Sequence, residues 1–378
     1  MAAVLISHSN APAMSSLFNP YLLGPNHLKN RIVMAPLTRR RAENPDLAAT
    51  PLMARYYRQR AGAGLIISEG SQVSPRAYGY THSPGCHSKN QVEAWMQVTD
   101  AVHKAGGRIF LQLWHVGPFS HPLLQPDGGL PMSASPVKPV GLVLTSRGRL
   151  PYESSRAMTV AEISETIDEF GQAAKNAIQA GFDGVEIHAA HAYLIDQFLM
   201  DGTNRREDLY GGSIENRSRF LFEVTGEILK HIDPGRVGIR LSPRPFKEGM
   251  GDSDPDRHYG WVVEKLNDYR LAYLHISERM EPETRLKEPE RSMLSLYRRI
   301  WKGTLISCGG HSPVSAAGVL ERGEADLLAF GKPYISNPDL IERIRKEIPL
   351  APADKETFYH GGARGYTDYP DHNGRIPL

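Results

Sequence analysis

Cysteine is nearly absent from this sequence, which contains only Cys86 and Cys308 among its 378 residues. Neither a disulfide framework nor a thiolate metal cluster can be built from so few thiols. Because such a composition suits a reducing compartment, we expect a cytoplasmic protein.

Long apolar runs are absent as well. No stretch of about 18 consecutive apolar residues occurs, so we expect no segment that spans a membrane. The apolar start of the chain is short, lacks a basic flank and precedes no convincing cleavage site. We interpret residues 1–14 as a loose extension, with either Met1 or Met14 as the true start.

An excess of one charge is also missing. The chain has 44 Lys and Arg against 42 Asp and Glu, a net charge of +2, and no basic block predicts a nucleic-acid partner. Dinucleotide and P-loop signatures are lacking too, because the nearest approach, residues 62–64, has no third glycine and precedes a strand. No composition shift marks a linker, so we expect one domain over residues 15–378.

The sequence does contain a regular alternation of short β-rich runs with amphipathic helical patterns. The runs are mostly apolar without alternation, as expected of parallel strands that are covered on both faces. We expect eight strands, at residues 32–36, 65–69, 109–114, 184–188, 237–241, 271–276, 304–308 and 327–330. Eight βα units favour an α/β protein with a closed (β/α)8 TIM barrel over an open doubly wound sheet.

Signals at helix ends support this alternation. Residues 159–162 form a capping box before a helical pattern. Ser312-Pro313 and Asn337-Pro338 each place an N-cap residue before a proline at the first helical position. We therefore expect helices to begin at these three points.

Two segments depart from the repeat. Residues 17–30 carry two turn signals before the first strand, which predicts an N-terminal hairpin that plugs the amino-terminal end of the barrel. Residues 116–158 form a long Pro-, Gly- and Ser-rich loop insertion after strand 3. In a barrel this insertion emerges on the catalytic face, so we expect a lid or a wall of the substrate pocket.

The fourth expected strand ends in three proton-active side chains, His188, His191 and Tyr193. A single histidine there is more simply explained as a hydrogen-bonding strand cap, but a second histidine and a tyrosine within five residues favour a catalytic site. Other polar or glycine residues follow the remaining strands, where barrel enzymes assemble their sites. They are Pro36, Leu37, Thr38, Gly70, Gln112, Trp114, Arg240, Gly309, Gly310, Gly331 and Lys332. The glycine pairs before proline-capped helices are typical of a phosphate cradle, although each alone is more often a tight turn.

Five motifs occur in order between about Leu17 and Tyr369. They are Met34-Ala-Pro-Leu-Thr-Arg39, Gln112-Leu-Trp-His115, His188-Ala-Ala-His-Ala-Tyr193, Tyr210-Gly-Gly-Ser213 and Gly331-Lys-Pro-Tyr-Ile-Ser-Asn-Pro338. Together they resemble the Old Yellow Enzyme family of FMN-dependent ene-reductases, including its 12-oxophytodienoate reductase-like members. The resemblance implies a barrel that holds non-covalent FMN, is reduced by NADPH or NADH, and is reoxidised by a small-molecule activated alkene in a ping-pong mechanism.

The same resemblance implies roles for the flavin-binding residues. Thr38 would contact the flavin near C4-O and N5, and Gln112 would hold its pyrimidine ring. Arg240 would lie beside N1 and C2-O, where its fixed charge favours the reduced flavin; the alternative is a salt bridge within the barrel. The remaining cofactor-binding candidates are the residues after strands 1, 2, 7 and 8 given above.

Roles in the reaction also follow from the resemblance. His188 and His191 would bind the carbonyl oxygen of an α,β-unsaturated substrate, hydride would pass from flavin N5 to Cβ, and Tyr193 would protonate Cα. Trp114 and Tyr366 resemble pocket residues of the family. Tyr80 and Arg279 are further candidates, for which an exposed loop tyrosine and a surface arginine are the alternatives.

Two positions depart from the commonest family pattern. Many relatives have Asn where this chain has His191, so protonation of two imidazoles could make ligand binding sensitive to pH. Relatives usually have Arg at Lys332, and an ammonium cannot grip the FMN phosphate with a fork.

Three hypotheses about function remain at this point. The favoured one is an NAD(P)H-dependent ene-reductase, monomer or homodimer, that acts on activated alkenes, with quinones or nitro compounds as further candidate acceptors. A metal-dependent barrel hydrolase or aldolase could use the histidine pair, although the sequence supplies no convincing third ligand and we expect no metal. A flavin-binding protein without turnover is the third, and the intact His188, His191 and Tyr193 argue against it.

Overall fold

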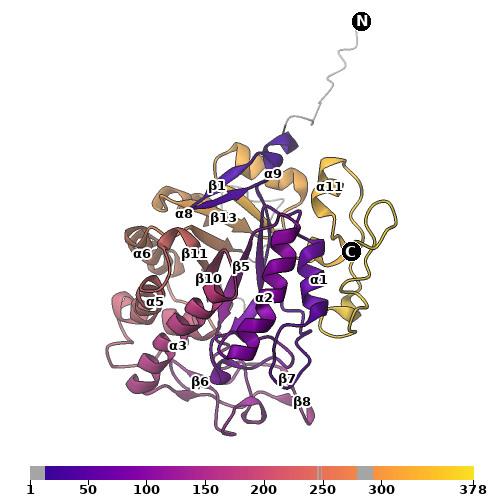
Figure 1. Ribbon diagram of the computed structural model, residues 1–378. Coiled ribbons are helices and arrows are strands. Elements are labelled where there is room, and N and C mark those ends of the chain that lie inside the picture. The colour runs from indigo at the N-terminus through magenta and orange to yellow at the C-terminus, as the bar shows by residue number, and fades with distance from the viewer. Residues whose placement is uncertain (1–12, 245–246, 248, 279–292) are drawn as a thin grey trace, which may run out of the picture.

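A closed barrel of eight parallel strands forms the centre of the computed structural model, which describes residues 13–244, 247, 249–278 and 293–378 (Figure 1). The strands are β3 (Ile32–Met34), β4 (Leu65–Gln72), β5 (Ile109–Trp114), β10 (Gly184–Ala189), β11 (Val237–Leu241), β12 (Tyr273–Ser277), β13 (Thr304–Cys308) and β14 (Leu327–Phe330). Neighbours in the chain are neighbours in the barrel, and β14 pairs with β3 to close it. The predicted (β/α)8 TIM barrel is confirmed.

Helices follow the strands and cover the outside of the barrel (Figure 1). They are α1 (Pro51–Gln59), α2 (Lys89–Lys104), α3 (Val160–Gln179), α4 (Leu194–Leu199), α5 (Ile214–Leu229), α6 (Pro255–Leu266), α8 (Met293–Ile300), α9 (Pro313–Glu321), α10 (Lys332–Ser336) and α11 (Leu340–Arg345). All the barrel strands except β13 are buried along their whole length, which explains their continuous apolar sequences. None of the helices in these described ranges is both long and apolar enough to cross a membrane.

Two of the three expected helix starts are confirmed and one is wrong. The capping box at residues 159–162 opens α3, and Ser312 caps α9. Asn337 instead ends the short helix α10, and its side-chain amide donates to the carbonyl of Pro333 at 2.8 Å. With that side chain engaged in the preceding turn, α11 begins later, after Asp339.

The predicted hairpin is present at the amino-terminal end of the barrel. It consists of β1 (Tyr21–Leu23) and the antiparallel β2 (Asn26–Leu28). Leu23 and Leu28 are fully buried in a cluster with side chains of the barrel strands, so the hairpin closes this end. The hydroxyl of Tyr21 lies 2.8 Å from that of Thr304, at the start of β13.

The insertion after the third barrel strand lies at the opposite end of the molecule from β1 (Figure 1). It contains the short strands β6 (Met132–Ser133) and β9 (Arg156–Ala157) and an antiparallel hairpin of β7 (Leu142–Thr145) and β8 (Gly148–Pro151). Val143 and Tyr152 pack in one cluster with Trp114, at the end of β5. The expected position on the carboxyl-terminal face is therefore confirmed.

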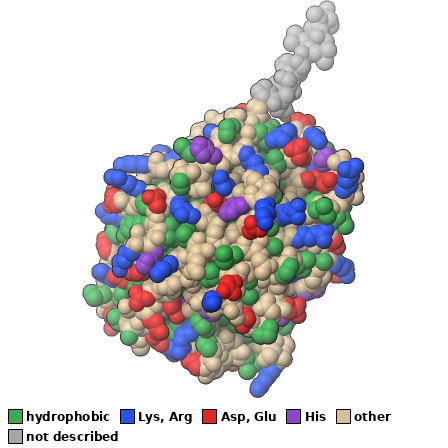
Figure 2. All heavy atoms as spheres, in the orientation of Figure 1, with side chains coloured by type: hydrophobic (Ala, Val, Ile, Leu, Met, Phe, Trp, Pro, Cys, Tyr) green, Lys and Arg blue, Asp and Glu red, His purple; other side chains and the backbone are tan. Residues whose placement is uncertain are grey.

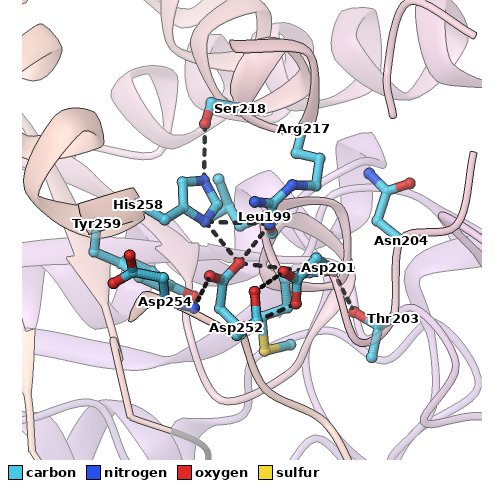
Figure 3. Close-up of polar contacts among 12 residues, drawn as sticks. Leu199, Asp201, Thr203, Asn204, Arg217, Ser218, Asp252, Asp254, His258 and Tyr259 are labelled. Atoms are coloured by element: carbon cyan, nitrogen blue, oxygen red, sulfur yellow. Dashed lines mark hydrogen bonds and ion pairs between the residues drawn. The ribbon is translucent and has the colours of Figure 1, made fainter. Parts of the chain in front are cut away.

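A buried polar cluster joins α4, α5 and α6 outside the barrel (Figure 3). The Arg217 guanidinium donates to the Asp252 carboxylate and to the carbonyl of Leu199. His258 lies between Asp252, at 2.9 Å, and the hydroxyl of Ser218, at 3.1 Å. The side chains of Arg217, Asp252 and His258 are almost completely buried. This cluster, which we call the Arg217 cluster, fixes the end of α4, the element that follows the histidines of the fourth strand.

Charged side chains of both signs are mixed on the face shown in Figure 2, and no continuous basic track crosses it. The balance agrees with the net charge of +2. Nothing on this face favours a polyanionic partner.

Candidate active site

The structure brings His188, His191 and Tyr193 together at the carboxyl end of β10. The ring centroids of His188 and Tyr193 are 5.1 Å apart, and those of the two histidines are 5.4 Å apart. Trp114 from the adjacent strand β5 completes the cluster, 5.0 Å from Tyr193 and 6.3 Å from His188. The packing of one aromatic ring on the next orients all four side chains.

A left-handed turn sets the direction of these side chains. His191 and Ala192 have φ angles of +61° and +65°, a conformation that costs free energy in residues other than glycine. Asp196 holds the turn, because its carboxylate accepts hydrogen bonds from the Ala192 N–H at 2.8 Å and from the Tyr259 hydroxyl at 2.6 Å. Ser242 supports the other side by accepting the His191 N–H at 2.7 Å. Hydrogen bonds from both backbone N–H groups to buried polar side chains therefore hold the turn in this conformation.

Asp196 gives a stability test of this turn. Burial raises the pKa of Asp196 to about 7, and its hydrogen bonds only partly oppose this. Because the folded pKa lies above the unfolded value of about 3.9, this residue should make the protein less stable as pH rises from about 4 to 7. Asp196→Asn cannot titrate and should lose this pH dependence, which urea denaturation at pH 5 and 7.5 would measure.

Asp196→Ala is the matched variant, since it leaves the Ala192 N–H without its acceptor. We expect a loss of about 1–3 kcal/mol in unfolding free energy, the cost of a buried unsatisfied donor. If Asp196→Asn and Asp196→Ala behave alike, the carboxylate does not hold the turn.

Both histidines are held in the neutral form. Burial is the main cause that lowers the pKa of His188 and His191 well below the usual range, and the Arg240 charge lowers both further. The sequence suggested that binding could be sensitive to pH through these imidazoles. Because these pKa values are so low, both rings are uncharged around pH 7. Any pH sensitivity of ligand binding through these imidazoles is therefore confined to acidic pH.

A cavity of about 410 Å³, which we call the inner cavity, is bordered by Tyr193. Thr38, Tyr80, Tyr152, Tyr193 and Tyr359 are among its lining residues. The Tyr193 hydroxyl points to that of Tyr80, 3.2 Å away, and burial raises the pKa of Tyr193 above its ordinary value. Tyr193 is thus a protonated hydroxyl at a cavity wall. Tyr80 is not an exposed loop tyrosine, since it lines the same cavity.

Arg240 lies on β11 directly beside His188 in the strand register. It has no carboxylate partner within the described ranges, and it donates instead to Ser277 at 3.2 Å and to the Cys308 sulfur at 3.5 Å. Its buried Nε and the buried Nδ1 of His188 have no hydrogen-bond partner among the described residues. Buried donors and acceptors of this kind are normally satisfied, so their place at the barrel mouth fits a polar ligand.

A buried ion pair lies below Arg240 in the barrel interior. His275 on β12 contacts Glu186 on β10 at 2.8 Å, and the Tyr273 hydroxyl donates to the same carboxylate oxygen at 3.1 Å. The other oxygen accepts the Gln112 amide at 2.8 Å, which fixes that side chain. The amide oxygen of Gln112 has no partner among the described residues, so it can accept a hydrogen bond from a ligand.

Sequence reasoning missed Glu186 and His275. The signal was present, because each is an ionisable residue within an apolar strand that is buried on both faces. Two such residues on different strands are a pair only if the barrel register places them side by side, and the sequence does not give that register. Burial alone would raise the pKa of Glu186. His275 and several weaker contributors outweigh this effect, so the pKa of Glu186 lies below its usual value.

The candidate flavin-binding residues surround the same mouth. Pro36, Leu37 and Thr38 follow β3, and Gly331 follows the neighbouring strand β14; a Cβ on Gly331 would lie 3.4 Å from Leu37 Cδ2. A Cβ on Gly70 would lie 2.6 Å from the Trp114 ring, so no side chain fits there.

The phosphate end of the expected cradle is formed by two strand ends. Gly309 and Gly310 connect β13 to the Ser312 cap of α9, and Gly310 has a φ of +69°. Lys332 is the first residue of α10, exposed and without an ion-pair partner in the described part of the chain. Glycine-rich backbone beside a cation fits an anionic group.

Two predicted pocket residues need separate comment. Tyr366 does not line the inner cavity; it is fully buried, stacked on Tyr56 at 4.0 Å with the Arg39 guanidinium over its ring, and its role as a pocket residue stays a prediction. Tyr359, earlier in the same C-terminal segment, lines the cavity instead. Arg279 lies outside the described residues.

The hypothesis of a metal-dependent enzyme finds no support in the arrangement of the described side chains. Among the residues that the structure describes, no three His, Cys, Asp or Glu side chains come together as a metal site. His191 Nε2 lies 3.0 Å from the Ser277 hydroxyl, a hydrogen-bonding arrangement.

Unpaired polar atoms, a glycine-rich anion cradle and an aromatic cavity meet at the mouth of one TIM barrel. This arrangement fits a flavin-dependent oxidoreductase. Residues 16–351 match the NADH:flavin oxidoreductase / NADH oxidase family, and the chain belongs to this family. The resemblance drawn from the five motifs is therefore confirmed, and FMN is the cofactor of the family.

Relatives and solved structures agree with this assignment. The chain is 42% identical over 372 residues to 12-oxophytodienoate reductase 7 of Oryza sativa subsp. japonica, covering 94% of each chain. Morphinone reductase in complex with tetrahydroNAD is 45% identical with a TM-score of 0.89, covering 96% of this chain and 99% of that one. An old yellow enzyme homologue from Zymomonas mobilis is 42% identical, also with a TM-score of 0.89, covering 94% and 99%.

Proposed function

We propose that this protein reduces the C=C bond of α,β-unsaturated carbonyl compounds with NADPH or NADH, by a ping-pong mechanism. The observation that carries the proposal is the convergence of two neutral imidazoles and a protonated tyrosine at the carboxyl end of β10, with Arg240 beside His188 on the neighbouring strand and Tyr193 in the wall of the inner cavity. The names of the relatives support the substrate class, since 12-oxophytodienoate and morphinone reductases are among them. Quinones and nitro compounds are further acceptors of the same kind.

FMN, when bound, supplies the redox chemistry by accepting a hydride from the nicotinamide coenzyme and passing it to the alkene. The chain's own residues bind and orient it. We assign Thr38 and the Gln112 amide to the flavin edge, and Arg240 to the side where negative charge accumulates on reduction. Gly70, Gly309, Gly310, Gly331 and Lys332, with Pro36 and Leu37, complete the proposed FMN site. Lys332 would neutralise the phosphate without the two-pronged grip of an arginine.

His188 and His191 act on the substrate in this proposal. A neutral imidazole donates one N–H, so two of them can hold one carbonyl oxygen and stabilise the negative charge that develops on it. Tyr193 then delivers its proton to Cα of the enolate. Trp114, Tyr80 and Tyr359 would form the walls that position the alkene.

We further propose a cytoplasmic location, on the strength of the two free cysteines, and a monomer or homodimer that acts on small molecules alone.

The test is a visible spectrum of the purified protein before and after anaerobic NADPH. We expect a yellow protein that bleaches with NADPH, recovers its colour with an enone, and releases FMN and no metal on denaturation. A para-substituted phenol should bind as the phenolate and give a long-wavelength charge-transfer band, which His188→Ala/His191→Ala should abolish while FMN stays bound.

Each other hypothesis predicts a different result. A colourless protein with stoichiometric zinc would support the metal-dependent hydrolase, and a yellow protein that no nicotinamide bleaches would support a flavin-binding protein without turnover. A charge-transfer band that persists in the double variant would remove the histidines from the carbonyl site.

A further inference from the structure

A second hollow of about 580 Å³, which we call the outer cavity, adjoins the inner cavity. The two share four lining residues, Arg40, Leu144, Arg149 and Tyr359. A molecule whose reactive end lies beside Tyr193 therefore extends into the outer cavity if it is long enough. The chemistry of the outer cavity then decides which long molecules bind well.

The outer cavity is rich in cationic side chains. Arg40, Arg149 and Lys355 line it together with His82 and His360. Two carboxylates, Glu43 and Glu356, line it as well, but neither forms an ion pair with the three cations within the described ranges. Cations that face a cavity without a carboxylate partner favour an anionic ligand.

Arg40 is held in place by its backbone conformation and by a hydrogen bond of its side chain. Its backbone has a φ of +60°, and its Nε donates to the Thr81 carbonyl at 2.7 Å. The two terminal nitrogens of the guanidinium have no hydrogen-bond partner among the described residues. Burial lowers the pKa of Arg40, and the nearby charge of Arg149 lowers it further. Two like charges from distant parts of the chain are thus held near each other across the opening.

The wall that carries Lys355 and Tyr359 is fixed by Arg41. The Arg41 guanidinium donates to the carbonyls of Thr357, Phe358, His360 and Gly362 at 2.6–3.2 Å. Four hydrogen bonds from this rigid guanidinium therefore hold the C-terminal segment, and a fifth, to the carbonyl of Arg39, fixes the guanidinium itself. The opposite wall is the hairpin β7–β8, which carries Leu144 and Arg149. The cationic opening is therefore built before a ligand arrives.

We propose that the outer cavity binds the oxyanion of a molecule whose reactive end occupies the inner cavity, with Arg40, Arg149 and Lys355 as its ligands. Two sources share this chemistry: a phosphate of the nicotinamide coenzyme and a carboxylate on the alkene substrate. The inference rests on the proposed function for the location of the reactive end, but the anion site itself is defined by the cationic residues.

The test compares matched pairs of ligands on the FMN-loaded protein. Dissociation constants for NADPH and NADH come from anaerobic reduction, and KM values come from an enone that carries a carboxylate and from its methyl ester. We expect at least one pair to favour the more anionic member by about fivefold, the effect of one solvent-exposed charge pair. Arg149→Gln and Lys355→Gln should each bring that ratio towards one, whereas Lys104→Gln, which removes an exposed charge on α2, should not.

The ligand pair whose affinity ratio falls in the Arg149→Gln and Lys355→Gln variants identifies the source of the oxyanion. A ratio near one for both pairs, or ratios that neither cavity variant changes, would overturn the proposal. A readout without turnover separates this failure from that of the proposed function: inorganic phosphate should raise the melting temperature of the FMN-loaded protein more than chloride at equal ionic strength, and Arg149→Gln should reduce the difference. If no coenzyme bleaches the protein while this phosphate effect is present, the proposed function fails and the anion site stands.

Discussion

Tyr193→Phe is expected to slow the reaction of the reduced protein with an enone by about 10²- to 10⁴-fold, the usual contribution of a positioned general acid. The reason is that Cα of the enolate needs a proton, and the buried Tyr193 hydroxyl is a protonated group in the cavity wall. Reduction by NADPH needs no proton from the protein, so that half-reaction should change little. The ring contacts with Trp114 and His188 remain in the variant, which limits any loss of packing.

Stopped-flow measurement of the two half-reactions tests this expectation. Cyclohexenone should react slowly with the variant, whereas a quinone, which can take its protons from water, should be largely spared. Tyr80→Phe is the matched control, because it removes the hydroxyl that accepts the Tyr193 hydrogen bond but keeps the proposed acid. Equal slowing with both oxidants, or slow reduction by NADPH, would show that Tyr193 positions ligands and is not the acid.

The second large effect is expected in the Arg217 cluster. Arg217→Ala should lower the unfolding free energy by about 3–5 kcal/mol, because it leaves the buried Asp252 carboxylate without its cation. The double variant Arg217→Ala/Asp252→Ala removes the unpaired charge, so its loss should be smaller than the sum of the two single losses. Urea denaturation at pH 7 measures all three, with Lys230→Ala, an exposed residue at the opposite, C-terminal end of α5, as a control that should change little. Additive losses would show that the two side chains do not interact.

The pH dependence of this effect follows from Asp252. Hydrogen bonds from His258 and Arg217 outweigh the opposing effect of burial and hold the pKa of Asp252 below its usual value. A depressed folded pKa adds stability above the unfolded value of about 3.9, and this is lost as pH falls through the folded pKa. The difference between the wild-type protein and Arg217→Ala should therefore narrow below about pH 4.

The barrel was predictable from the sequence because each of its strands has a local signal. A continuous apolar run requires burial on both faces, and eight such runs between helical patterns leave few alternatives to a closed barrel. The capping box at residues 159–162 and the Ser312 cap are local as well, and both are present. The polar residues at the strand ends could be located for the same reason, since parallel strands deliver them to one end.

Features that depend on distant contacts were not predictable in this way. The position of Tyr359 in the inner cavity depends on how Arg39 and Arg41 bind the C-terminal segment, which has no hydrophobic periodicity of its own. The pairing of Glu186 with His275 depends on barrel register. Asn337 was misassigned because its side chain bonds backward to Pro333, a choice that an Asn-Pro pair alone does not reveal.

The β1–β2 hairpin at the far end of the barrel has a kinetic consequence. Side chains fill the barrel and the hairpin covers its amino-terminal end, so ligands enter only from the carboxyl-terminal face. Under the proposed function the coenzyme and the alkene then use one entrance, and neither reaches the centre while the other occupies it. Each turnover then requires the oxidised coenzyme to depart before the acceptor enters, so a high concentration of either reactant should inhibit the protein by competing for the form that the other needs. Under the proposed function, strict alternation of the two reactants therefore follows from the single open face of the barrel.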